Sequence, residues 1–225
     1  MRNINCESLN SPSNVLVENG NDAHVIKMWS KREFVTNRFY QTGFETILFN
    51  KDRTFAIETV LSSVVTLDDE ILIAGYGKSL DELERKAVEQ GIIYHIYNWF
   101  TDGWNRVDEV VAANPKISKI LIGIDAETSV DDIPVEALLA VAAKRKTGLI
   151  VYCETNVDGL NDRFKGAIDF MIADCDCHTK HSFVVARRSK LVQTEGVSRS
   201  FNFDLYRFWQ WSMRKRNSII EPMCV

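Results

Sequence analysis

Thiol and imidazole side chains gather in the segment DCDCHTKH, which spans residues 174–181. The side chains that are able to bind a metal there are those of Cys175, Cys177, His178 and His181. Two thiolates and two imidazoles are ligands that zinc prefers in tetrahedral sites, although the C-x-C-H-x-x-H spacing is more compact than the usual pairing. The segment therefore has three interpretations: a site for zinc or another metal, a reactive or disulfide-forming cysteine pair, or a strand end with buried thiols and exposed imidazoles.

Apolar runs alternate with amphipathic runs along most of the chain, and they predict strands that alternate with helices. Strands are predicted over residues 45–50, 70–76, 92–99, 119–125, 148–153, 168–175 and 181–188. Helices are predicted over residues 53–65, 79–91, 106–115 and 134–146, the second with Ser79 as its N-cap and Gly91 at its end. Continuously apolar strands are typical of a sheet that is buried on both faces. The pattern predicts an α/β three-layer sandwich with a mainly parallel sheet, in which ligands lie at the carboxyl ends of the strands.

The composition is that of a globular chain with one domain. Residues 1–23 are predicted to form a loose lead-in, and residues 24–225 the domain itself. The formal net charge of -4 argues against non-specific nucleic-acid binding. No apolar run approaches the roughly 20 residues that cross a bilayer, so no membrane association is expected. Five cysteines without an apolar export signal predict reduced thiols in the cytoplasm.

Several segments follow one another in an order that resembles 2-aminoethylphosphonate–pyruvate transaminase, a class V (fold type I) aminotransferase that depends on pyridoxal 5′-phosphate (PLP). The similar segments are RTFAIETVLSSVV, GYGKSLDELERKAVEQGI, the long run from KISKILIGID to GLIVYCE, GAIDFMIAD, FVVARRSKL and SRSFNFDLYRFWQWS. The resemblance implies the large, cofactor-binding domain of that fold, as a homodimer with sites at the subunit interface. It also implies that the small C-terminal domain is absent, because the chain ends shortly after the last similar segment.

The resemblance maps the family's cofactor contacts onto particular residues of this chain. The glycine-rich phosphate turn of the family falls on residues 51–54, where only Thr54 is retained and the glycines are replaced. The carboxylate that keeps the pyridine nitrogen protonated falls on Tyr152, and a phenol supplies no negative charge at neutral pH. The hydroxyls of Thr128 and Ser129 match family hydroxyls near the ring oxygen.

The lysine that forms the Schiff base in the family falls on Cys177 of this chain. Lys180 lies three residues later, and it would serve as a shifted lysine if the shortened turn brought it into the crevice. Since lysine, carboxylate and phosphate turn are altered together, the expectation is an aminotransferase-like pseudoenzyme with no cofactor, acting as a binding or assembly partner. Two alternatives stay open: a PLP enzyme that acts on a small amino acid or aminophosphonate through Lys180, and a metal protein or other enzyme that reuses the crevice through the Cys/His cluster.

A partner is also expected from the aromatic run FNFDLYRFWQW at residues 201–211. Loss of the small domain would uncover part of this run, and exposed apolar area of that kind is usually covered by another chain. A homodimer, or a complex with another protein, is therefore predicted.

Overall fold

The computed structural model describes residues 43–103, 106–154, 163–164, 167–174 and 181–220, and the predicted lead-in of residues 1–23 lies outside them. Within these residues one seven-stranded sheet runs through the molecule in the order β1-β7-β6-β5-β4-β2-β3. The strands are β1 (Phe44–Phe49), β2 (Glu70–Gly75), β3 (Ile93–Asn98), β4 (Ile117–Ile124), β5 (Gly148–Cys153), β6 (Phe170–Asp174) and β7 (Ser182–Arg187).

The central part of the sheet is parallel, as predicted. Strands β3, β2, β4, β5 and β6 pair in parallel, whereas β7 runs antiparallel to both β6 and β1. Because β1 is antiparallel to β7, it runs in the same direction as the parallel strands. The carboxyl ends of β1, β5 and β6 therefore meet at one edge of the sheet.

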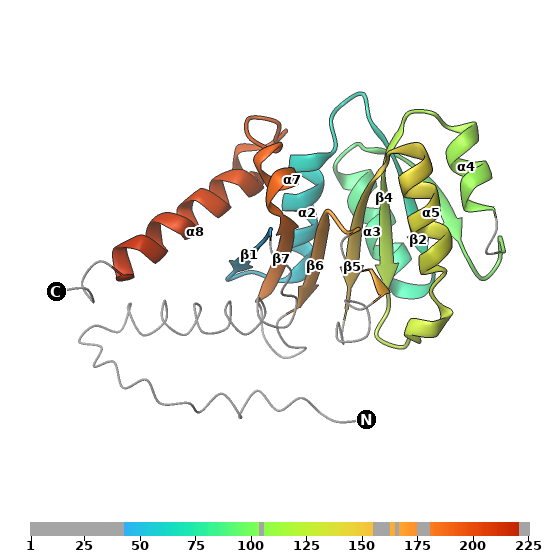
Figure 1. The fold of residues 1–225 in the computed structure, drawn as a ribbon, viewed down its shortest axis with the longest axis horizontal. Coiled ribbons are helices and arrows are strands. Elements are labelled where there is room, and N and C mark those ends of the chain that lie inside the picture. Colours follow the sequence, from blue (N-terminus) through green and yellow to red (C-terminus); the bar gives the residue numbers. More distant parts are fainter. Residues whose placement is uncertain (1–42, 104–105, 155–162, 165–166, 175–180, 221–225) are drawn as a thin grey trace.

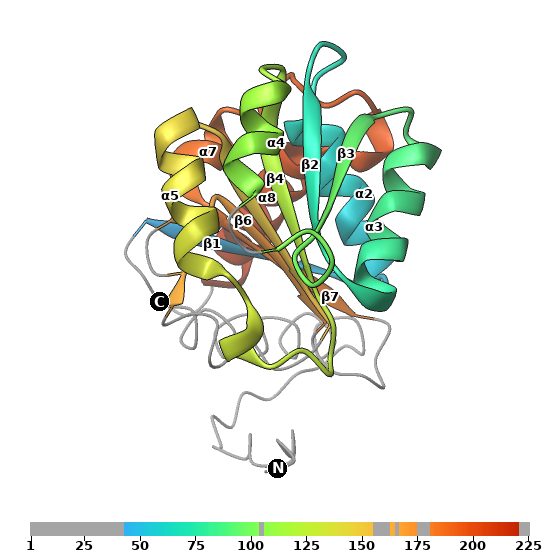
Figure 2. The same cartoon turned by 90° about the vertical axis from the view of Figure 1, so that its right-hand side faces the viewer.

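Helices cover both faces of the sheet, so the predicted three-layer sandwich is confirmed (Figures 1 and 2). The helices are α2 (Arg53–Val64), α3 (Gly77–Glu89), α4 (Val107–Ala113), α5 (Val135–Arg145), α7 (Arg188–Val192) and α8 (Leu205–Ile220), with short 3-10 turns at Val130–Asp132 and Phe201–Phe203. One core lies between the sheet and α4 and α5, and the other lies between the sheet and α2, α3 and the start of α8. Alternate residues of β5 enter opposite cores: Val151 faces α5, and Tyr152 faces α2 and α3.

The start of α3 differs from the prediction. The helix begins at Gly77, and Ser79 lies inside its first turn, where its backbone N–H donates to the Asp125 carboxylate at 2.7 Å. The N-cap prediction for Ser79 is therefore wrong, because a side chain from the end of β4 satisfies the helix end instead. Gly77 adopts a φ of +65°, and a Cβ there would lie 2.2 Å from the same carboxylate. Gly91 follows the helix at φ +64°, as a helix-ending glycine does.

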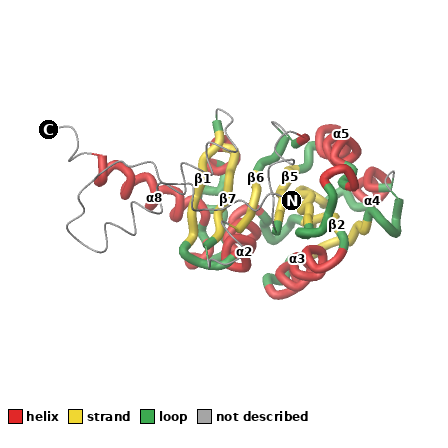
Figure 3. Tube along the Cα trace, turned by 90° about the horizontal axis from the view of Figure 1, so that it is seen from below, coloured by secondary structure: helices red, strands yellow, loops and turns green. Residues whose placement is uncertain are grey.

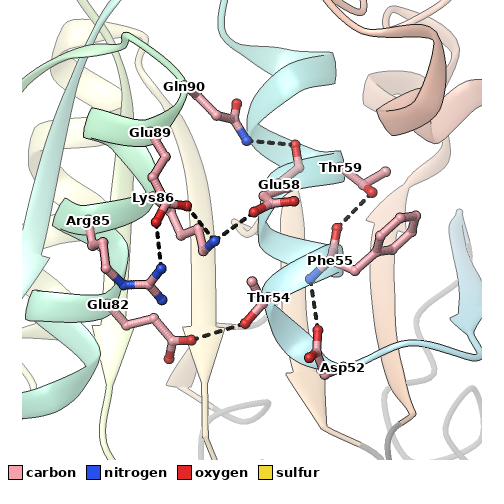
Figure 4. Close-up of polar contacts among 10 residues, drawn as sticks. All are labelled: Asp52, Thr54, Phe55, Glu58, Thr59, Glu82, Arg85, Lys86, Glu89 and Gln90. Carbon is pink, nitrogen blue, oxygen red and sulfur yellow. Dashed lines mark hydrogen bonds and ion pairs between the residues drawn. The ribbon is translucent and has the colours of Figure 1, made fainter.

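Helices α2 and α3 are joined by a buried cation (Figure 4). The ammonium of Lys86 donates to Glu58 at 2.6 Å and to Glu89 at 2.5 Å, and the Lys86 residue is only 4% exposed. The Gln90 amide adds a bond to the Glu58 carbonyl at 3.1 Å. These contacts fix the distance between the two helices, and so they position the residues at the α2 N-terminus.

Helix α8 packs on the molecule through its first turns and then extends beyond the β1 edge of the sheet (Figures 1 and 3). Leu205 is fully buried, whereas Trp211 is 56% exposed. In the part of the chain that the structure describes, no helix has the length and apolar character needed to span a membrane.

Candidate functional site at the carboxyl edge of the sheet

Helix α2 begins at the carboxyl edge of the sheet, where three carboxylates surround its first residue. Arg53 pairs through Nε with Glu82 at 3.3 Å, through Nη2 with Glu154 at 3.1 Å and through Nη1 with Asp174 at 3.6 Å. Glu82 comes from α3, Glu154 directly follows β5, and Asp174 ends β6. The Arg53 side chain is 33% exposed and the three carboxylates 14–16%. Together with Tyr152, these residues form what we call the Arg53 cluster.

Tyr152 lies beneath Arg53 and is fully buried. Its hydroxyl donates to Glu82 Oε2 at 2.9 Å, and the Arg53 guanidinium lies 5.9 Å from the centre of its ring. Burial raises the pKa of Tyr152 far above that of an ordinary phenol, and the Glu82 charge raises it further. The phenol is therefore neutral and acts as a hydrogen-bond donor at any physiological pH.

The surroundings of Asp174 disfavour its ionised form. Burial raises its pKa from 3.8 to about 6, Arg53 opposes this shift, and the charges of Glu82 and Glu154 add to it. A single guanidinium thus does not fully compensate the carboxylates that gather around it.

The N-terminus of α2 is closed by its own side chain. Asp52 is the N-cap, and its carboxylate accepts from the Phe55 backbone N–H at 3.2 Å (Figure 4). Thr54, the residue retained from the family's phosphate turn, lies within hydrogen-bond reach of Glu82 Oε1 at 3.5 Å (Figure 4). Two of the predicted cofactor-binding residues, Thr54 and Tyr152, are therefore brought together, and both contact Glu82.

Thr128 and Ser129 follow β4, the strand next to β5, and neither makes a hydrogen bond to a residue of the Arg53 cluster. The Thr128 hydroxyl is buried and has no hydrogen-bond partner among the described residues. Ser129 is exposed, and its hydroxyl accepts from the Asp131 backbone N–H at 3.4 Å. These two predicted residues thus lie at the same edge of the sheet, in a separate group.

Four of the five predicted metal and lysine positions lie outside the described residues. These four are Cys175, Cys177, His178 and Lys180, whereas half-buried His181 precedes β7. Within the described ranges, no group of three or more His, Cys, Asp or Glu side chains is arranged to hold a metal ion. The zinc site, the cysteine pair and the shifted lysine therefore remain predictions.

Two features of this edge were not predicted. Glu82 lies in the charged run DELERK, which has the pattern of a solvent-facing helix surface, yet its side chain is only 14% exposed. Tyr76, at the end of β2, packs edge-on against Phe100 with ring centroids 4.4 Å apart, and against Trp99 at 5.8 Å. The sequence indicated this aromatic group only through the residue types at the ends of two strands.

Comparison with known proteins identifies the class of this fold. No protein-family model matches the chain. Among solved structures, the ureidoglycine–glyoxylate aminotransferase of Bacillus subtilis superposes with a TM-score of 0.67 at 20% identity, over 89% of this chain and 54% of its own. The pyridoxamine–pyruvate aminotransferase of Mesorhizobium loti gives 0.64 at 12% identity, over 88% and 53%. The fold is that of an aminotransferase large domain.

The sequence relatives are more specific. The chain is 27% identical over 177 residues to the 2-aminoethylphosphonate–pyruvate transaminases of Salmonella paratyphi C and Salmonella typhimurium, over 75% of this chain and 48% of each relative. The resemblance to class V aminotransferases, and among them to 2-aminoethylphosphonate–pyruvate transaminase, is thereby confirmed. The chain spans about half the length of these curated relatives.

Proposed function

We propose that this chain is an aminotransferase-like domain that does not carry out transamination, and that it acts as a binding or assembly partner. The observation that carries the proposal is Tyr152. At the end of β5, where the family resemblance places a carboxylate for the pyridinium nitrogen, the chain has a buried phenol whose hydrogen already bonds to Glu82. A neutral donor there cannot keep the ring nitrogen of a PLP cofactor protonated.

PLP is nonetheless the cofactor that the comparisons make plausible for a chain of this fold, since one similar structure is described as SPT with PLP. When bound, PLP supplies an electron sink for chemistry at an amino carbon. The residues of this chain do not fit it. The Asp52 carboxylate accepts a hydrogen bond from a backbone amide at the α2 N-terminus, and carboxylates pair with Arg53. By the family resemblance, Cys177 falls at the position of the Schiff-base lysine.

A partner chain is part of the proposal. Phe201 is 77% exposed and Trp211 56%, and both belong to the aromatic run that ends in α8. A homodimer or a complex with a second protein would cover these rings. Light scattering of the purified chain is expected to give a mass above that of one copy, and a strict monomer at micromolar concentration would contradict a homodimer.

Turnover tests the absence of transaminase chemistry. The chain is mixed with excess PLP, an amino donor (2-aminoethylphosphonate or L-alanine) and a 2-oxo acid acceptor. The expected rate equals that of PLP in buffer without protein. A higher rate that Lys180→Ala abolishes would contradict the proposal and favour the alternative of a shifted lysine, and Lys78→Ala, at an exposed position of α3, is the matched control.

A further inference from the structure

We propose that the Arg53 cluster excludes phosphate-bearing ligands from the α2 N-terminus, because the chain places its own anions where a phosphate would bind. The exclusion of phosphate is a property separate from the loss of transamination. A crevice can reject a phosphate and still form an imine, or admit a phosphate and form none.

The α2 N-terminus has the general features of an anion site. It lies at the carboxyl edge of the sheet, and its backbone N–H groups and helix dipole favour the binding of a negative charge. Arg53, as the first helical residue, adds a guanidinium to this field. A phosphate would be attracted to such a position if these donors were available.

Several of these donors, however, are already in use. The Arg53 guanidinium has three nitrogens, and each of them pairs with a carboxylate from a different element. A phosphate binds arginine through two parallel hydrogen bonds, so it would compete with these carboxylates for the N–H groups of the guanidinium. The Phe55 amide is likewise bonded to the Asp52 carboxylate (Figure 4).

The carboxylates cannot withdraw far, because the sheet fixes the backbone of two of them and a hydrogen bond holds the third. The Glu154 backbone N–H continues the strand ladder by donating to the Ile124 carbonyl at 3.1 Å, and Asp174 pairs with Ser182 of β7. Glu82 is held by the Tyr152 hydroxyl as well as by Arg53. A displaced carboxylate would therefore remain close to the incoming phosphate.

The charge balance opposes a phosphate in either ionisation state of Asp174. With Asp174 ionised, one guanidinium faces three carboxylates, and with Asp174 protonated it still faces two. A phosphate dianion would enter a site of net negative charge. At separations of about 5 Å, each such repulsion weakens binding by about fourfold in the dielectric constant of water and by about 300-fold in that of a protein surface, so two of them amount to at least about tenfold.

Pyridoxine 5′-phosphate and pyridoxine form a matched pair of probes, since they differ only in the phosphate and neither has an aldehyde that forms an imine. In calorimetric titrations, the wild-type chain is expected to bind the phosphate ester no more tightly than the alcohol. The absence of binding for both probes also agrees with this expectation. In the variant Glu154→Gln with Asp174→Asn, the ester is expected to bind at least about tenfold more tightly than the alcohol. The matched control, Asp68→Asn with Glu195→Gln, changes the net charge equally at two exposed positions and should show no preference.

Two results would overturn the proposal. One is a wild-type chain that prefers the phosphate ester by tenfold or more and loses this preference in Arg53→Met. The other is a folded double variant, checked by circular dichroism, that gains no preference. If the double variant does not fold, the single substitution Glu154→Gln is titrated in its place, and it must show a gain for the proposal to stand. None of these results depends on an imine with a lysine. The proposed function can therefore fail while the exclusion of phosphate holds, and the exclusion of phosphate can fail while the proposed function holds.

Discussion

Replacing Arg53 by methionine removes the cation at the centre of the cluster and leaves Glu82, Glu154 and Asp174 facing one another. Methionine keeps most of the apolar stem, so the loss is mainly electrostatic. Removing one partner of a fully buried ion pair costs about 3–5 kcal/mol. Since the Arg53 side chain is 33% exposed, water screens part of the charge, and we expect a loss of about 2–3 kcal/mol at pH 7.5.

The loss should depend on pH, and its sign follows from Asp174. Its pKa is about 6 in the folded chain against an ordinary 3.8, so the fold penalises the ionised form. Protonated Asp174 therefore adds to the free energy of unfolding. This contribution is complete below about pH 4 and is lost as the pH rises through about 6. It amounts to at most about 3 kcal/mol. Arg53 lowers the pKa of Asp174, so in Arg53→Met this contribution is lost at a higher pH than in the wild type.

Urea unfolding at pH 7.5 and pH 4.5 measures both effects. The deficit of Arg53→Met relative to the wild type should fall to roughly half at pH 4.5, because protonated Asp174 no longer repels the neighbouring carboxylates. Adding Asp174→Asn to Arg53→Met should restore about 1 kcal/mol at pH 7.5, as coupled neighbours do in a double-mutant cycle.

The control is Arg106→Met, which breaks an exposed ion pair with Glu109 and should leave the free energy of unfolding unchanged. A deficit for Arg53→Met below about 0.5 kcal/mol, or one that is the same at both pH values, would refute the electrostatic account of the cluster.

Three further substitutions test other contacts through the free energy of unfolding at pH 7.5. Lys86→Met removes the buried cation between α2 and α3, and is expected to cost about 1–3 kcal/mol by leaving Glu58 without its partner; a neutral result would mean that the pair only offsets its own desolvation. Gly77→Ala places a Cβ against Asp125 at a left-handed φ, and should cost about 1–3 kcal/mol, whereas a stabilised variant would contradict this local geometry. Burial lowers the pKa of Lys119 in β4, whose ammonium donates to the Ser118 carbonyl at 3.4 Å and to the Ser118 hydroxyl at 3.3 Å. If the desolvation of its charged form outweighs these bonds, Lys119→Met should stabilise the chain by about 0.5–2 kcal/mol, and any loss would show that the bonds outweigh the desolvation.

Much of the fold could be predicted because its signals are local. Apolar runs longer than a turn locate the strands, and β5 has the predicted bounds of residues 148–153. The other predicted boundaries lie within two residues of the observed ones, and a helix boundary shifts where a neighbouring element supplies the cap. The start of α3 is such a case, since the Asp125 carboxylate, 46 residues away from Ser79 in the sequence, bonds to the first turn.

The site was predictable only in part, because its contacts join four elements. The family resemblance pointed to Tyr152 and Thr54, and both do lie next to Arg53 or its partners. The resemblance did not indicate that Glu82 would join them. In a charged helical run, the sequence does not distinguish a glutamate that faces solvent from one that faces the interior of the protein. Which charge on α3 turns inward depends on how α3 packs against α2, and that follows from tertiary contacts such as the bond between Lys86 and Glu58.

Trapping of an imine tests the central claim most directly, because it asks whether Lys180 of this chain binds PLP covalently. The chain is incubated with PLP, reduced with borohydride, digested and mapped by mass spectrometry. We predict that Lys180 carries no more adduct than the exposed lysines of the chain. One adduct per chain at Lys180 would contradict the claim that this aminotransferase-like domain has lost its transaminase chemistry.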